Sequence, residues 1–142
     1  MEELLTLKTY IETGKYSDAL LLINELEEMS LKDTFNKISS YSTIVLLHLI
    51  KQQAEKRTTR SWEASIKESL FRINKTNKRY KAKGFVADKD TLKDILEEDF
   101  PIALLKASLE TFEGKYSADE LEKIVNKDQI IEKALTLIID EQ

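Results

Sequence analysis

The sequence predicts a single all-α domain over residues 1–142, a bundle of about six to eight helices built from antiparallel helix hairpins. Three observations support this prediction. A chain of 142 residues can bury one hydrophobic core and is too short to need two. One Pro and three Gly are far fewer than strands and tight turns require. Apolar residues recur at helical spacing, and a hydrophobic fraction of 42% separates the chain from disordered sequences.

The first two helices are predicted at the N-terminus. Residues 3–13 carry apolar side chains at helical spacing, and Gly14 suits the residue after a helix end, where φ is positive. Ser17 is the expected N-cap of a second helix that ends over residues 27–30. Because the connection is so short, the two helices are expected to pack as an antiparallel hairpin.

The third helix is predicted to be the central one. A cap at Ser30 or Asp33 starts it, and its apolar density rises from Ile38 to Ile50, interrupted near the end only by His48. Because so few polar residues interrupt this run, the helix is expected to be buried on most sides.

A polar connector then leads to the fourth helix. Residues 58–61 are expected to form the turn, with Thr59 or Ser61 as N-cap. Apolar side chains follow at helical spacing and predict a core-facing stripe: Trp62, Ile66, Leu70 and Ile73.

The C-terminal part is predicted to be helical after a break. Residues 74–88 are charged and lack periodicity, so they are expected to form a frayed helix end and an exposed basic loop. Helices follow over residues 89–140, where Pro101 either kinks one helix or begins a new one. Ser117 and Glu120 predict a capping box before helices at 118–125 and 128–139.

The sequence argues against catalytic and metal chemistry. It has no cysteine and one histidine, His48, whereas a metal site or a nucleophile–base pair needs more such partners. The carboxylate runs at 25–28 and 97–99 are interpreted as solvated helix faces. We expect no cofactor, and we favour a non-enzyme; a polar pocket lined by His48, Lys51 and Arg60 would indicate an enzyme instead. The absence of cysteine, of a signal-like N-terminus and of a long apolar run favours a cytoplasmic protein with no membrane segment.

Charge is strongly segregated along the chain. Residues 1–50 carry 8 acidic and 4 basic side chains, residues 51–84 carry 3 and 11, and residues 85–142 carry 15 and 7. The net charges are therefore −4, +8 and −8. A basic block between acidic ones predicts either a surface for an acidic protein partner, in this or a second copy, or a nucleic-acid site over residues 51–83 in which Phe71 or Tyr80 stacks on bases.

The residues around this connector resemble a known family. His48-Leu49-Ile50-Lys51, Arg57, Arg60-Ser61-Trp62 and Ser65-Ile66 are similar to the signature of the domain of unknown function family numbered twenty-nine, in its cyanobacterial branch. The resemblance implies an all-helical bundle with no established activity. The chain departs from the common pattern at Gln52, where many members have Trp, and at Ser69-Leu70, which replace a Gln-Arg pair.

From these observations the leading hypothesis is a non-enzymatic protein-interaction module with a protein partner or a homo-oligomer, and the alternative is nucleic-acid binding through residues 51–83. The candidate interaction residues belong to the apolar run, the connector and the helix start: His48, Lys51, Lys56, Arg57, Arg60, Ser61 and Trp62.

Overall fold

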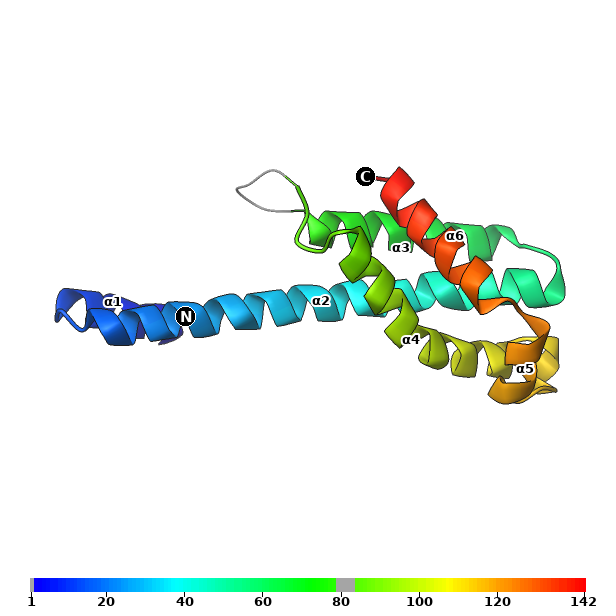
Figure 1. Cartoon of the computed structure of the whole chain (residues 1–142), viewed down its shortest axis with the longest axis horizontal. Helices are drawn as coiled ribbons and strands as arrows, with labels where there is room; N and C mark the ends of the chain where they lie inside the picture. Colours follow the sequence, from blue (N-terminus) through cyan, green and yellow to red (C-terminus); the bar gives the residue numbers. More distant parts are fainter. Residues whose placement is uncertain (1, 79–83) are drawn as a thin grey trace. The chain divides into compact units, whose positions relative to one another are not determined.

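A computed structural model describes residues 2–78 and 84–142, which form six α-helices and one 3-10 helix and no extended strand. The elements, shown in Figure 1, are α1 (Glu2–Glu12), α2 (Tyr16–Glu55), α3 (Arg60–Asn77), α4 (Lys89–Glu110), η1 (Phe112–Gly114), α5 (Ala118–Ile124) and α6 (Lys127–Asp140). The predicted all-α class is confirmed. The chain forms two compact units, residues 1–35 and 36–142, and each is described by itself. The single-domain organisation stays a prediction.

The unit of residues 1–35 contains a well-formed helix end and little core. The Lys15 N–H donates to the Tyr10 carbonyl at 2.7 Å and the Gly14 N–H to the Ile11 carbonyl at 3.2 Å, which is a Schellman motif. Gly14 has φ +75, as predicted. Helix α2 begins at Tyr16, so Ser17 lies inside its first turn and the predicted N-cap is wrong. Ala19 is the buried hydrophobic residue among the described residues of this unit.

The predicted break between the second and third helices is wrong. Residues 16–55 form one helix, so Ser30 and Asp33 are interior helical residues and not caps. The stretch 27–33 reads EEMSLKD, which contains neither Gly nor Pro and therefore nothing that stops the backbone hydrogen bonds. The change in pattern near residue 30 marks a change in burial, since residues 27–33 are exposed and the buried positions begin again at Ile38.

The unit of residues 36–142 holds the hydrophobic core. Helix α4 packs on α5 and α6, and α3 packs on α6 (Figure 1). Side chains from all of these helices and from α2 are fully buried, among them Leu46, Ile50, Ile73, Leu96, Phe100, Leu121, Ile131 and Leu135. Pro101 lies inside α4, which bends in its middle in Figure 1. Of the two predicted roles of Pro101, the kink is therefore right and the new helix start is wrong.

One carboxylate of the acidic run 97–99 is partly buried in this core, contrary to the solvated face expected for the run. The Ser39 hydroxyl donates to both carboxylate oxygens of Asp99, at 2.7 and 2.9 Å. Burial raises the pKa of Asp99, and the hydrogen bond from Ser39 opposes that shift.

A buried asparagine closes the connection between α3 and α4. Asn77 is fully buried; its Nδ2 donates to the Ala87 carbonyl at 3.0 Å and its Oδ1 accepts from the Ala87 N–H at 2.6 Å. The Val86 N–H adds a bond to the Asn77 carbonyl at 2.8 Å. Residues 74–77 are thus helical and tied down, so the predicted frayed end is wrong. Of the exposed loop predicted as far as residue 88, residues 79–83 lie outside the described residues, and Ala87 is buried and not exposed.

The C-terminal helices follow the sequence prediction closely. The Glu120 N–H donates to Ser117 Oγ and the Ser117 N–H donates to Glu120 Oε1, both at 3.2 Å, which confirms the capping box. Asn126 caps α6 by accepting a hydrogen bond from the Gln129 N–H at 3.1 Å.

Candidate functional site

The predicted site residues lie where α2 turns into α3. Helix α2 ends at Glu55, and Lys56 reverses the chain with φ 53. The Trp62 N–H donates to Thr59 Oγ1 at 3.1 Å, so Thr59 is the N-cap of α3. Of the two predicted caps Thr59 is right and Ser61 is wrong, because Ser61 lies exposed in the first helical turn.

Trp62 is a boundary residue and not the core residue that the helical stripe predicted. Ile66, Leu70 and Ile73 of that stripe are buried, whereas Trp62 is partly exposed. Two cations lie over its ring, Lys51 Nζ and the Arg57 guanidinium carbon, each 4.6 Å from the ring centroid. Such cation–π contacts hold long basic side chains in one place.

Both of these cations also contact a carboxylate. Lys51, which is only 6% exposed, donates to Glu110 Oε1 at 3.0 Å. Arg57 Nε donates to Glu55 Oε1 at 2.8 Å. A buried ammonium needs such a partner, because burying it alone would be very costly. The corner is therefore a network of one aromatic ring, two cations and two carboxylates.

Glu55 connects this network to η1. Its Oε2 accepts from the Phe112 N–H at 3.0 Å, and that hydrogen bond is the main reason why the pKa of Glu55 lies below its usual value; Arg57 contributes in the same direction and burial opposes. Phe112, Glu113 and Gly114 all have positive φ, at 49, 57 and 75. Left-handed conformations at two non-glycine residues are strained, so the Glu55 hydrogen bond helps to fix this turn.

His48 adds an aromatic neighbour to the corner. Its ring centroid is 6.5 Å from that of Trp62. Its Nδ1 is buried and has no hydrogen-bond partner among the described residues. Burial lowers the pKa of His48, Lys51 lowers it further and Glu110 acts in the opposite direction.

We predict that His48 titrates below its usual value of about 6.5 and is neutral at pH 7. Since the folded-state pKa is depressed, the unfolded chain binds the proton first on acidification. The stability contributed by neutral His48 is complete above about pH 6.5 and is lost as the pH falls through the folded-state pKa. The ring-proton NMR signal of this sole histidine measures the pKa directly. The same signal in urea provides the reference, and a folded-state value at or above the urea value would contradict the prediction.

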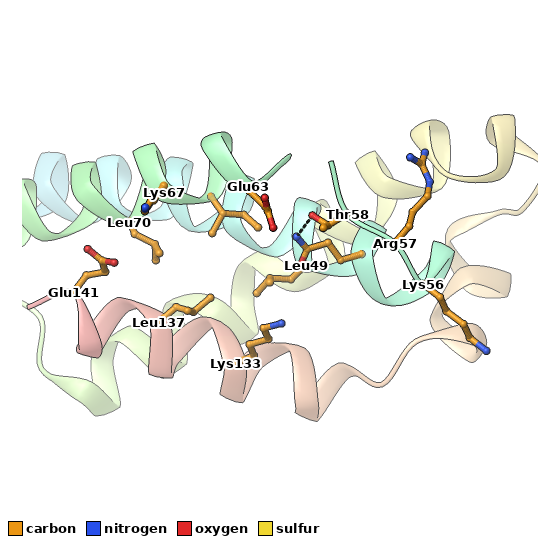
Figure 2. Close-up of a pocket in the computed structure, with 12 residues that line it drawn as sticks. Leu49, Lys56, Arg57, Thr58, Glu63, Lys67, Leu70, Lys133, Leu137 and Glu141 are labelled. Carbon is orange, nitrogen blue, oxygen red and sulfur yellow. Dashed lines mark hydrogen bonds between the residues drawn. The ribbon is translucent and has the colours of Figure 1, made fainter. Parts of the chain in front are cut away.

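A groove runs beside the corner, between α3 and α6 (Figure 2). Its volume is about 740 Å³. Leu49 of α2, Leu70 of α3 and Leu137 of α6 point into the same space, and Lys56 and Arg57 lie at one end. The charged lining side chains are four basic and two acidic: Lys56, Arg57, Lys67, Lys133, Glu63 and Glu141. His48, Lys51 and Arg60 are not among the residues that line this groove.

The basic block does not form one free surface. Within it, Lys51 and Arg57 are held by the corner network, and Arg72 pairs with Glu68 at 3.9 Å. The remaining described cations are exposed: Lys56, Arg60, Lys67, Lys75 and Lys78. Tyr80 and the basic residues Arg79, Lys81 and Lys83 lie outside the described residues.

Several residues of the site were missed by the sequence prediction. Glu110 and Phe112 reach the corner from the end of α4 and from η1, and Lys133 and Leu137 reach the groove from α6. They follow Trp62 by 48 to 75 positions in the sequence, so no local pattern connects them with it. Only the fold brings these residues together.

The fold and this corner define a small helical-bundle protein whose polar cluster is built from contacts between side chains. A family model described as Domain of unknown function DUF29 matches residues 13–136, and the chain belongs to that family. No curated protein and no solved structure gives a significant match. The described residues contain no group of three or more His, Cys, Asp or Glu side chains placed to hold a metal ion. None of the described helices has the length and apolar character needed to cross a bilayer.

Proposed function

We propose that this protein is a cytoplasmic, non-enzymatic protein-interaction module that binds an acidic amphipathic helix of a partner in the groove between α3 and α6. The observation that carries the proposal is the lining of the groove, which joins an apolar floor to a rim with four cations and two carboxylates. Amphipathic helices bind such grooves through apolar residues one turn apart, while charges at the rim select the partner.

The floor suits a helix because its apolar side chains come from three different helices. Leu49, Leu70 and Leu137 converge on one space (Figure 2), and Ile66 lies one turn before Leu70 on α3. An apolar stripe at positions i, i+3 or i+4, and i+7 of a bound helix would cover them.

The rim supports an acidic partner with a defined direction. Lys56 and Arg57 lie at one end of the groove, and Glu141 lies toward the other (Figure 2). The C-terminus of a helix carries partial negative charge, so a bound helix would place that end next to Lys56 and Arg57. Arg57 is already fixed by Glu55 and Trp62, so little side-chain entropy would be lost there on binding.

Charge reversal at the rim tests the proposal. The double substitution Lys67→Glu plus Lys133→Glu changes two exposed side chains and should leave the fold intact. It should reduce recovery of the partner in a pull-down with the full chain by about tenfold or more. Lys106→Glu is the matched control, since Lys106 is exposed on α4 and does not line the groove.

The same pull-down separates this proposal from the nucleic-acid alternative. Captured material is scored for protein and for nucleic acid, with and without nuclease and over a range of salt concentrations. The proposal is supported by a protein that is still recovered after nuclease treatment, is lost with the double variant and is kept with Lys106→Glu. Equal recovery with both variants, or recovery that depends on nucleic acid and falls steeply with salt, contradicts it.

A further inference from the structure

A second pocket lies at the C-terminal end of α3 and has a volume of about 380 Å³. This falls within the size of roughly 300–1,000 Å³ that small-molecule sites show. Its lining combines aromatic, basic, amide and acidic side chains, namely Phe71, Asn74, Lys75, Lys78, Phe85, Glu141 and Gln142. Apart from Glu141, it shares no residue with the groove between α3 and α6.

The end of α3 presents a ring and two cations to the pocket. Phe71 and Lys75 occupy positions i and i+4 of α3 and so lie above one another on the helix, and Lys78 follows directly after the helix end. Phe71 is 62% exposed, and both lysines are exposed. An exposed aromatic ring followed by ammonium groups is the combination with which proteins stack a base and hold its phosphate.

Asn74 is a half-buried residue of this wall. Its Nδ2 donates to the Ile138 carbonyl at 3.0 Å, and this bond fixes which way the amide is turned. Its Oδ1 is buried and accepts no hydrogen bond from the described residues. Because this oxygen has almost no exposed surface, the contribution of Asn74 is to tie the end of α3 to α6 and so to fix the wall of the pocket.

The part of the pocket formed by Phe85 is held in place by the connection between α3 and α4. Phe85 and Lys78 form a backbone bridge, and the next residue, Val86, is bonded to Asn77. Asn77 in turn holds Ala87 through two hydrogen bonds. The aromatic side chain of Phe85 therefore lines a site with a fixed backbone.

We infer that this pocket binds one nucleoside monophosphate unit, either free or within a single-stranded nucleic acid. The base stacks on Phe71, and Lys75 and Lys78 contact the phosphate. Glu141 offers an acceptor to the ribose hydroxyl groups. The inference is independent of the proposed groove, because Phe71, Lys75 and Lys78, which carry it, do not line that groove.

The test uses the full chain and two probes, adenosine monophosphate and a fluorescein-labelled ten-nucleotide single-stranded RNA. Binding is measured by NMR shift changes for the mononucleotide and by fluorescence anisotropy for the RNA. Phe71→Ala should weaken binding about tenfold, since stacking on one aromatic ring has an effect of that order. Phe71→Tyr should preserve it. Lys75→Glu plus Lys78→Glu should weaken it further and reduce the salt dependence.

Matched controls use exposed residues of α4. Leu109→Ala removes a side chain that is 72% exposed, and Lys106→Glu reverses a charge away from the pocket. Binding of the mononucleotide identifies a free nucleotide as a ligand, and binding of the RNA alone identifies a single strand. Binding of neither probe overturns the inference. So does RNA binding that depends on the two lysines but is unchanged by Phe71→Ala, because that result leaves only attraction between charges.

Discussion

Replacing Asn77 with alanine is expected to lower the free energy of unfolding by about 3 kcal/mol. The Asn77 side chain is fully buried and makes two hydrogen bonds to Ala87, one through Nδ2 and one through Oδ1. Ala87 is itself 1% exposed, so its N–H and its carbonyl would both lose a partner out of reach of bulk water. An unsatisfied buried group costs about 1–3 kcal/mol, and the expected loss is the sum of two such costs.

Urea unfolding followed by the fluorescence of the sole tryptophan measures this change. Asn126→Ala is the matched control: Asn126 is exposed and its side chain caps α6, so its loss should cost only about 1 kcal/mol. Asn77→Asp adds a pH signature. A buried carboxylate facing the Ala87 carbonyl should have a raised pKa, and its protonated form can donate to that carbonyl. The Asp variant should therefore gain stability relative to wild type as the pH falls through that raised pKa. Equal losses for Asn77→Ala and Asn126→Ala would contradict the structural role of Asn77.

Features set by neighbouring residues could be predicted from the sequence. Gly14 ends α1, Thr59 starts α3 and Ser117 with Glu120 starts α5, each through a rule that acts over a few residues. The all-α class follows from the same local patterns. The predicted break near Ser30 is wrong because a run of polar residues was interpreted as the end of one helix and the start of the next. Polar residues without Gly or Pro can continue a helix, and here they mark only the loss of burial.

The candidate site was predictable only in part, for a different reason. The sequence locates His48, Lys51, Arg57 and Trp62 close together because two adjacent helices bring them to one corner. It gives no signal for Glu110, which neutralises the buried Lys51, or for the groove residues on α6. Net charge along the chain also hides pairing, since Lys51 and Arg57 count toward the basic block but are held by carboxylates.

Trp62 shows where the helical pattern gives the right face and the wrong environment. As the first residue of a stripe continued by Ile66 and Leu70, it was expected to be buried. It lies instead in the first turn of α3, and its neighbours are the charged ends of Lys51 and Arg57 and the His48 ring. An aromatic ring with a large quadrupole can hold cations at such a boundary, which an aliphatic residue cannot do.

We therefore predict that Trp62→Ala lowers the free energy of unfolding by about 2 kcal/mol, below the 3–5 kcal/mol typical of a fully buried tryptophan. Part of the loss comes from the apolar surface that the partly exposed ring buries against its neighbours. The rest comes from the two cation–π contacts, each worth about 0.5–1 kcal/mol at an exposed site. Urea unfolding followed by far-ultraviolet circular dichroism measures the change, because the variant lacks the fluorescent reporter.

Trp62→Phe separates the two contributions. Phenylalanine keeps most of the covered area but attracts cations less strongly, so its cost should be about 1 kcal/mol. The two cations are also expected to lose order together in Trp62→Ala, because Lys51 and Arg57 share this ring and each also holds a carboxylate. Hence Arg57→Ala should cost less in the Trp62→Ala background than in the wild type, a coupling that a double-mutant cycle measures. Additive costs, or equal costs for Trp62→Phe and Trp62→Ala, would show that the ring acts by apolar contact alone and would contradict the role of Trp62 as the centre of the corner network.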